Sequence, residues 1–183
     1  MPYIILDRDG VINFESREYI KSPEEWLAIP GSLDAIAQLN RSGFHVLVVT
    51  NQSGVARGYF DLEMLDTIHE KMMSELATVG GYIDEIFFCP HHPDEHCSCR
   101  KPKPGLFKQI AAKYPLQMQN TFYIGDSFSD VLAAQAAGCL PLLVKTGNGE
   151  LALQRHPELA NIPHFADLAS AVEYVLSQEK IHA

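Results

Sequence analysis

The sequence predicts an α/β fold, a Rossmann-like parallel sheet with helices on both faces. Short apolar runs rich in Ile, Val and Phe recur along the chain, and amphipathic stretches of helical length separate them. Apolar runs without alternation are typical of parallel strands buried on both faces. Regular alternation of strand and helix is typical of a sheet covered on both sides. Polar residues also gather directly after the apolar runs, where ligands bind in such folds.

Five apolar runs are predicted to be strands. They are YIIL at 3–6, FHVLVV at 44–49, EIFF at 85–88, TFYI at 121–124 and LPLLV at 140–144. The spacing of apolar residues predicts helices at 31–43, 61–80, 104–114, 130–138 and 166–178. Gly43, Gly80 and Gly138 are placed where helix C-caps are expected.

Length and charge limit the classes of protein to which the chain can belong. Its 183 residues suit one domain, so we expect a single domain over 1–183. No apolar run reaches the roughly 18 residues that cross a bilayer, and the N-terminus lacks the basic region of a signal peptide. A net charge of −9 disfavours non-specific binding to nucleic acid. We therefore expect a cytoplasmic monomer with a small anionic ligand and no nucleic-acid or membrane partner.

Acidic residues at the strand ends predict a metal site. The polar segments that follow strands are DRDG from 7, TNQSG from 50, CPHHP from 89 and GDSFSD from 125. In an extended segment Asp7 and Asp9 point to one face and Arg8 to the other. Two converging carboxylates repel each other, and a hard cation such as Mg²⁺ relieves this, with Asp126 and Asp130 as further contributors. The alternative is that the first two aspartates cap the following turn.

A second metal site is predicted in the segment FCPHHPDEHCSCRKPKPG at 88–105. The C-x-H-x5-C-x-C set consists of Cys89, His91, Cys97 and Cys99. This set matches a closed, tetrahedral zinc site of structural type, although spacing also allows His92 or His96. A redox pair or free thiols are the alternatives, but C-x-C is a poor match to the C-x-x-C redox motif. Because Arg100 and Lys101 follow the last ligand, zinc would position this basic pair without taking part in the chemistry. Cys139 is interpreted as a core residue.

The order of DRDGVIN, TNQSG, CRKP and GDSFSD at successive strand ends resembles the haloacid dehalogenase superfamily of phosphotransferases over residues 7 to about 130. The resemblance implies that Asp7 is a nucleophile that attacks phosphorus and forms an aspartyl phosphate. It also implies that Asp9 protonates the leaving oxygen and then takes a proton from the attacking water. Asp130 either holds a metal-bound water or is the N-cap of the next helix.

The same resemblance identifies the groups that offset negative charge. A carboxylate that attacks a phosphate dianion is opposed by like charge, so cations are required. The implied Mg²⁺ ligands are Asp7, Asp126 and the backbone carbonyl of Asp9. Lys101 supplies the other positive charge. Thr50 and Asn51 would donate hydrogen bonds to the transferring phosphoryl group, from side chain and backbone, and an ordinary polar turn is the alternative.

Two subfamilies of phosphatases remain as interpretations of the substrate. The combination of DRDGVIN, TNQSGVARG, CPHHP and CRKPKPG is similar to the superfamily members that act on heptose bisphosphates. That resemblance implies a phosphorylated sugar as the substrate and a role in making nucleotide-activated heptose for lipopolysaccharide or surface glycans. The compact spacing from His91 to Cys97 resembles the histidinol-phosphate phosphatases of histidine biosynthesis, which is the alternative.

Residues beside the motifs would form the rim of the site, because the intervals between motifs leave no room for a large cap domain. The expected substrate-binding residues are Tyr19, Asn51, Gln52, Ser53, Arg57 and Arg100. Arg17, Arg57 and Arg100 are candidates to bind a second phosphate, or are solvated surface charges. The acidic residues Glu15, Glu18 and Asp94 would suit the amine of histidinol phosphate. A third hypothesis is a noncatalytic zinc module that binds a phosphorylated partner, which would need neither Asp7 nor Asp9.

Overall fold

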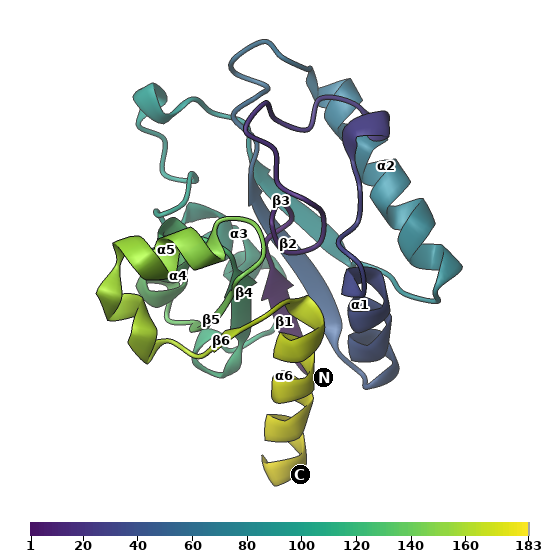
Figure 1. Cartoon of the computed structure of the whole chain (residues 1–183), viewed down its shortest axis with the longest axis vertical. Helices are drawn as coiled ribbons and strands as arrows, with labels where there is room; N and C mark the ends of the chain where they lie inside the picture. The colour runs from purple at the N-terminus through teal and green to yellow at the C-terminus, as the bar shows by residue number, and fades with distance from the viewer. Residues whose placement is uncertain (183) are drawn as a thin grey trace.

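A computed structural model describes residues 1–182 of the chain, so Ala183, the last residue of the expected domain, lies outside the described residues. The described part contains a six-stranded, fully parallel sheet in the order β3-β2-β1-β4-β5-β6 (Figure 1). The strands are β1 (Tyr3–Leu6), β2 (His45–Asn51), β3 (Glu85–Cys89), β4 (Phe122–Gly125), β5 (Leu140–Val144) and β6 (His164–Phe165). The α/β fold predicted from the sequence is confirmed.

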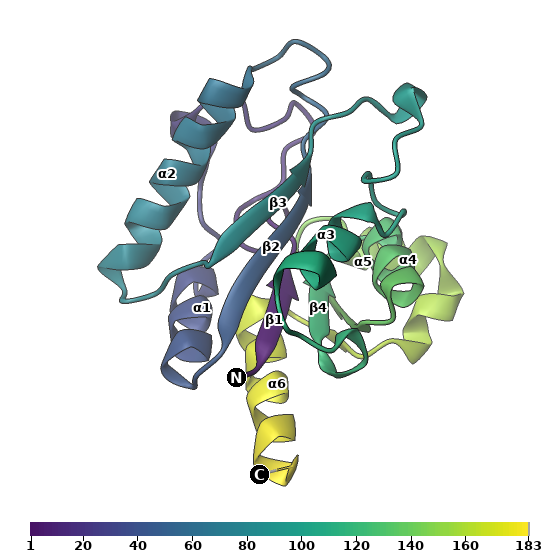
Figure 2. The ribbon, with the colours of Figure 1, turned by 180° about the vertical axis from the view of Figure 1, so that it is seen from behind.

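Helices cover both faces of this sheet. They are α1 (Ser32–Arg41), α2 (Leu62–Thr78), α3 (Gly105–Lys113), α4 (Phe128–Ala137), α5 (Gly149–Arg155) and α6 (Leu168–His182). Helices α1, α2 and α6 lie on one face and α3, α4 and α5 on the other, as both views show (Figures 1 and 2). None of the described helices combines the length and apolar character that a membrane span requires.

Burial on both faces explains the apolar runs of the central strands. In β1, Ile4 and Leu6 pack into the core under α1, α2 and α6, whereas Ile5 packs into the core under α3 and α4. All three side chains are fully buried. Since each face of the strand meets a helix layer, both sets of alternating positions must be apolar, and the sequence shows no polar alternation.

The ends of several elements match their sequence signals, and two elements escaped prediction. Gly43, Gly80 and Gly138 have φ of 90°, 77° and 81° at the ends of α1, α2 and α4, as expected for C-terminal caps. Strand β6 and helix α5 were not predicted, because a two-residue strand and a seven-residue helix are too short for a periodic pattern.

The strand order places the expected site at the centre of the sheet. From β1 the chain winds outward through β2 and β3 on one side, and β4, β5 and β6 extend the other side. The switch point therefore lies between β1 and β4, and ligands bind at the carboxyl ends of strands at such points. The segment between β1 and α1 is loop with a 3-10 turn at Pro23–Glu25. As expected, no large cap domain occurs within residues 1–182.

Candidate active site

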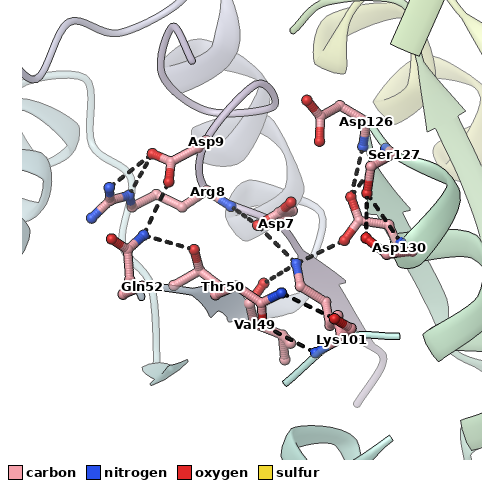
Figure 3. Close-up of polar contacts among 12 residues, drawn as sticks. Asp7, Arg8, Asp9, Val49, Thr50, Gln52, Lys101, Asp126, Ser127 and Asp130 are labelled. Atoms are coloured by element: carbon pink, nitrogen blue, oxygen red, sulfur yellow. Dashed lines mark hydrogen bonds and ion pairs between the residues drawn. The ribbon is translucent and has the colours of Figure 1, made fainter. Parts of the chain in front are cut away.

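Asp7 lies directly after β1 and faces a buried cation (Figure 3). Its backbone N–H donates to the carbonyl of Ile124 at 2.9 Å, so the pairing of β1 with β4 fixes its position. Its Oδ1 accepts a hydrogen bond from the Arg8 backbone N–H at 2.8 Å and lies 3.1 Å from Nζ of Lys101. The predicted nucleophile and the predicted cation are therefore in direct contact.

Lys101 is held by four oxygen atoms inside the protein. Its Nζ lies 2.7 Å from Oδ1 of Asp130, 2.9 Å from the Tyr123 hydroxyl, 3.1 Å from Asp7 and 3.2 Å from the Val49 carbonyl. The side chain is only 3% exposed. Burial acts to lower the pKa of Lys101, but the charges of Asp130 and Asp7 outweigh it and raise the pKa above its ordinary value. Lys101 is therefore a fixed positive charge at neutral pH.

Three buried carboxylates surround this lysine. Asp7, Asp126 and Asp130 each bring an oxygen atom within 4.8 Å of the others. Burial, and next the charge of Asp130, raise the pKa of Asp7 and of Asp126 well above the usual aspartate range. One lysine cannot neutralise three ionised carboxylates, so with all three ionised the cluster would carry excess negative charge, and the raised pKa values are the consequence. A set of hard oxygen donors with excess negative charge fits a divalent cation such as Mg²⁺.

Asp130 takes a different place in the helix than expected. Helix α4 begins at Phe128, and Ser127 is its N-cap, whose Oγ accepts from the backbone N–H of Asp130 at 3.1 Å. Oδ2 of Asp130 accepts from the backbone N–H groups of Asp126 and Ser127 at 3.0 and 3.2 Å. Of the two roles left open for Asp130, that of helix N-cap is therefore wrong. Burial opposes ionisation of Asp130, but Lys101 outweighs it and lowers the pKa to about 2.

Asp9 has a cation of its own. Oδ1 of Asp9 accepts hydrogen bonds from Nε and Nη2 of Arg8 at 2.9 and 2.8 Å and from Nδ2 of Asn13 at 2.9 Å. Oδ2 accepts from Nε2 of Gln52 at 3.0 Å. Burial acts to raise the pKa of Asp9, but the Arg8 charge and these hydrogen bonds lower it below its ordinary value.

This arrangement corrects the expectation that Arg8 points away from both carboxylates. Arg8 is fully buried, and a buried guanidinium needs a carboxylate partner, so its long side chain folds back onto Asp9. Asp7 and Asp9 are therefore each paired with a separate cation, Lys101 and Arg8, instead of depending on one cation between them.

Gln52 connects Thr50 to Asp9 through its side-chain amide. Thr50, in β2, is buried, and its Oγ1 accepts from Nε2 of Gln52 at 3.0 Å. The same Gln52 amide nitrogen donates to Asp9. Because the hydroxyl oxygen of Thr50 accepts this bond, its own proton is free to be donated elsewhere.

The expected rim residues line a cavity of 260 Å³ beside Asp9. The lining residues are Asp9, Glu15, Ser16, Arg17, Tyr19, Ile20, Asn51, Gln52, Ser53, Arg57 and Arg100. Nη1 of Arg100 is buried and has no hydrogen-bond partner among the described residues. The guanidinium of Arg57 lies 5.7 Å from the ring centre of Tyr19. The cavity thus gathers three arginines, which suits an anionic ligand.

The predicted cysteine and histidine ligands converge in space. The ligand atoms of Cys89, His91, Cys97 and Cys99 all lie within 4.8 Å of one another. Sγ of Cys99 lies 3.0 Å from Sγ of Cys89 and 3.2 Å from Nδ1 of His91. Sulfur atoms on a zinc ion at about 2.3 Å would be about 3.8 Å apart, so only small movements would complete a tetrahedron. His92 instead accepts from the backbone N–H of Asp94 at 3.1 Å, which leaves His91 as the histidine of the cluster.

Hydrogen bonds to the main chain hold both Lys101 and the cysteine loop in place. The side-chain amide of Asn51 donates to the Lys101 carbonyl at 3.2 Å and accepts from its N–H at 3.0 Å. The N–H of Gly105 donates to the Ser98 carbonyl at 3.1 Å, and a Cβ at this glycine would collide with that carbonyl. The chain between Cys99 and α3 is therefore fixed at both sides of the basic pair.

Several polar residues of the site were not predicted from the sequence. Tyr123, Asn13 and His69 contact Lys101, Asp9 and Arg8, respectively. Tyr123 pairs with Ile5 in the sheet, two residues before Asp7, so a strand register would have indicated it. Asn13 and His69 gave no comparable signal.

Comparison with known proteins finds relatives that are described as hydrolases or phosphatases. A family model described as HAD-hydrolase-like matches residues 98–171. A D-glycero-beta-D-manno-heptose-1,7-bisphosphate 7-phosphatase of Pseudomonas putida is 51% identical over 171 residues, covering 93% of this chain and 97% of that protein. The corresponding enzyme of Bordetella bronchiseptica is 48% identical over 180 residues, covering 97% and 99%.

Solved structures are similar over the same span. A crystal structure of D,D-heptose 1,7-bisphosphate phosphatase from B. bronchiseptica, complexed with magnesium and phosphate, has a TM-score of 0.94 at 48% identity and covers 97% of this chain and 99% of that one. The phosphatase of this name from Burkholderia thailandensis has a TM-score of 0.75 at 37% identity, with the same coverage.

Proposed function

The chain belongs to the family of D-glycero-beta-D-manno-heptose-1,7-bisphosphate 7-phosphatases, and from this membership we propose that it removes the 7-phosphate of that sugar bisphosphate. The observation that carries the proposal is the 48% identity and TM-score of 0.94, over nearly the whole chain, to such a phosphatase complexed with magnesium and phosphate. The reaction would serve the synthesis of nucleotide-activated heptose for lipopolysaccharide or surface glycans.

Asp7 and Asp9 would divide the first half of the reaction between them. Asp7, held by Lys101, attacks phosphorus and forms an aspartyl phosphate while the bond between phosphorus and the C7 oxygen breaks. The negative charge of a phosphate bound beside Asp9 opposes the lowering of the Asp9 pKa by Arg8, so that Asp9 can take up a proton. Asp9 gives this proton to the leaving oxygen, and the sugar leaves as an alcohol. Oδ1 of Asp9 already accepts three hydrogen bonds, which makes Oδ2, with its single bond from Gln52, the oxygen that carries the proton.

The second half uses the same carboxylate as a base. Asp9, now ionised, takes a proton from a water molecule, and the water oxygen attacks the phosphorus of the aspartyl phosphate. Inorganic phosphate leaves, Asp7 is regenerated, and Asp9 is protonated again. The charge of Lys101 and the free hydroxyl proton of Thr50 would stabilise the transferring phosphoryl group.

Residues at the switch point fit a magnesium ion. The proposed ligands are the carboxylates of Asp7 and Asp126 and the backbone carbonyl of Asp9. When bound, the ion would supply positive charge that offsets the repulsion between the carboxylate and the phosphate. The excess negative charge of the cluster supports this assignment. Asp130 remains a contributor through its contact with Lys101.

The cavity supports a bisphosphate in preference to histidinol phosphate. Arg17, Arg57 and Arg100 line it, and the buried, unpartnered Nη1 of Arg100 is a donor for a phosphate oxygen. Of the acidic residues that would suit an amine, Glu15 lines this cavity, whereas Glu18 and Asp94 are not among its described lining residues. We propose that Tyr19, Asn51, Gln52 and Ser53 complete the substrate site.

The cysteine cluster would hold a structural zinc ion through Cys89, His91, Cys97 and Cys99. A ligand set made entirely of protein atoms leaves no position for a reacting water. Its role would be to fix the loop that carries Arg100 and Lys101. Because the strands of the described chain share one sheet, we also propose a single domain over 1–183. We further propose that the protein acts as a monomer in the cytoplasm.

Phosphate release tests the assignment. Purified protein with Mg²⁺ is given the β and α anomers of heptose 1,7-bisphosphate and, separately, histidinol phosphate, and Asp7→Asn serves as the blank. The proposal predicts the highest kcat/KM for the β-bisphosphate, with loss of the 7-phosphate alone. Preference for histidinol phosphate would overturn the substrate, and full activity of Asp7→Asn would overturn the nucleophile.

A further inference from the structure

Helix α2 contributes a histidine to the hydrogen-bond network behind Asp9. Nε2 of His69 lies 3.0 Å from Nη1 of Arg8, which comes 61 residues earlier in the chain. Arg8 is fully buried and His69 is 8% exposed, so the contact is shielded from water. Nε and Nη2 of the same guanidinium both donate to Oδ1 of Asp9. A continuous set of hydrogen bonds therefore runs from α2 to the proposed general acid.

The charge state of His69 suits it to accept from Arg8. Burial, and next the charge of Arg8, lower the pKa of His69 to about 3, so the ring is neutral at neutral pH. An arginine has only donors, and a neutral imidazole has one acceptor nitrogen. Nε2 of His69 is therefore the acceptor, and Nδ1 carries the ring proton.

Arg8 needs this contact to hold one orientation. Its guanidinium is planar, so fixing Nη1 at His69 also fixes the direction of Nε and Nη2. In that direction they occupy Oδ1 of Asp9 and leave Oδ2 to Gln52, which lines the cavity together with Asp9. Without an acceptor for Nη1, a buried donor would be left unpaired, and the guanidinium would turn to satisfy it.

We propose that His69 is a positioning residue for proton transfer, which acts through Arg8 to keep Oδ2 of Asp9 directed at the leaving oxygen. The proposal rests on the proposed function, in which Asp9 is the general acid. It assigns to α2 a part in the chemistry that its position outside the substrate cavity does not suggest.

Two variants of His69 separate an acceptor role from a packing role. His69→Phe keeps a ring beside Phe88, whose ring centre lies 6.5 Å from that of His69, but it removes the acceptor. His69→Gln loses the ring but places an amide oxygen where it can accept from Arg8. Met72→Leu, a buried change one turn along α2, is the matched control. Thermal unfolding of each variant confirms that it is folded.

Leaving-group dependence provides a measurement that packing alone would not change. The kcat/KM covers the steps up to release of the alcohol, and a sugar alkoxide needs a proton from Asp9, whereas p-nitrophenolate leaves without one. For His69→Phe we expect kcat/KM to fall about tenfold with the heptose bisphosphate and less than about twofold with p-nitrophenyl phosphate, because general acids contribute about 10²–10⁴-fold. His69→Gln should recover most of the loss, and the KM for the bisphosphate should not change.

Each outcome decides one question. If the single-turnover rate of alcohol release by Asp9→Asn shows no leaving-group dependence, the proposed role of Asp9 fails, and with it the premise. If Asp9→Asn shows the dependence and His69→Phe does not, His69 has no positioning role. An equal loss with both substrates, or a folded His69→Gln that is as impaired as His69→Phe, would mean that the histidine only packs.

Discussion

Replacing Lys101 by methionine tests whether the site depends on one buried positive charge. Lys101 forms direct ion pairs with Asp130 at 2.7 Å and Asp7 at 3.1 Å, and its side chain is 3% exposed. Removing one partner of a buried pair typically costs about 3–5 kcal/mol, because the other charge is left without compensation. The folded variant can avoid part of this cost by protonating one carboxylate.

The cost of that protonation depends on pH, so the loss of stability must too. Holding a carboxyl of ordinary pKa protonated costs about 4 kcal/mol at pH 7 and about 1.5 kcal/mol at pH 5. In the wild type, the lowered pKa of Asp130 gives stability that is present above the unfolded pKa and is lost as pH falls toward 2. In Lys101→Met, Asp130 has lost its cation, and burial raises its pKa above the ordinary value. The free-energy cost of keeping this carboxyl protonated then grows as pH rises. The gap between the two proteins should therefore widen from about pH 4 upward.

Urea unfolding in the presence of a chelator measures this gap. Lys113→Met is the matched control, because Lys113 pairs with Glu85 at the same 2.7 Å but is 58% exposed. Exposed pairs contribute about 0–1 kcal/mol. We expect Lys101→Met to lose about 3–4 kcal/mol at pH 7 and less than half of that at pH 5. A loss no larger than that of Lys113→Met, or one equal at both pH values, would refute the reasoning.

Three other changes give separate predictions. Cys97→Ser should abolish stoichiometric zinc in metal analysis and weaken phosphate binding, and a zinc-free variant with full activity would contradict the role of the loop. Gly10→Ala should weaken Mg²⁺ binding about 10- to 100-fold in calorimetry. Gly10 has a backbone φ of 80°, and an added Cβ there would collide with the Asp126 carboxylate. Unchanged affinity would exclude Asp126 as a ligand. Arg100→Met should raise the KM for the bisphosphate about tenfold, and an unchanged KM would place the substrate elsewhere.

The sequence predicted the sheet well because its strands are buried on both sides. A strand such as β2, with Val46 to Val49 fully buried, leaves an apolar run that needs no long-range information to recognise. The same reasoning failed for β6, whose two residues, His164 and Phe165, are defined only by pairing with Leu143 and Val144. Short elements are stabilised by tertiary contacts, which no local pattern records.

The candidate site likewise contains residues that could be predicted from the sequence and contacts that could not. Asp7 and Asp126 were predictable because each follows a recognisable strand and strand ends meet at one edge of a parallel sheet. The contact of Arg8 with His69 was not predictable, because 61 residues separate them and the histidine lies on an ordinary amphipathic helix. The folding back of Arg8 onto Asp9 depends on its complete burial, which the extended pattern of DRDG does not reveal.

Direct detection of phosphate on Asp7 tests the central claim of covalent catalysis. Asp9→Asn, mixed with p-nitrophenyl phosphate and Mg²⁺, should release p-nitrophenolate in a stoichiometric burst and then stall, because the second half-reaction lacks its base. After an acid quench, mass spectrometry should find a phosphoryl group on the peptide that contains Asp7, and none when Asp7 is also replaced by Asn. Continued turnover by Asp9→Asn without a phosphorylated peptide would contradict the mechanism.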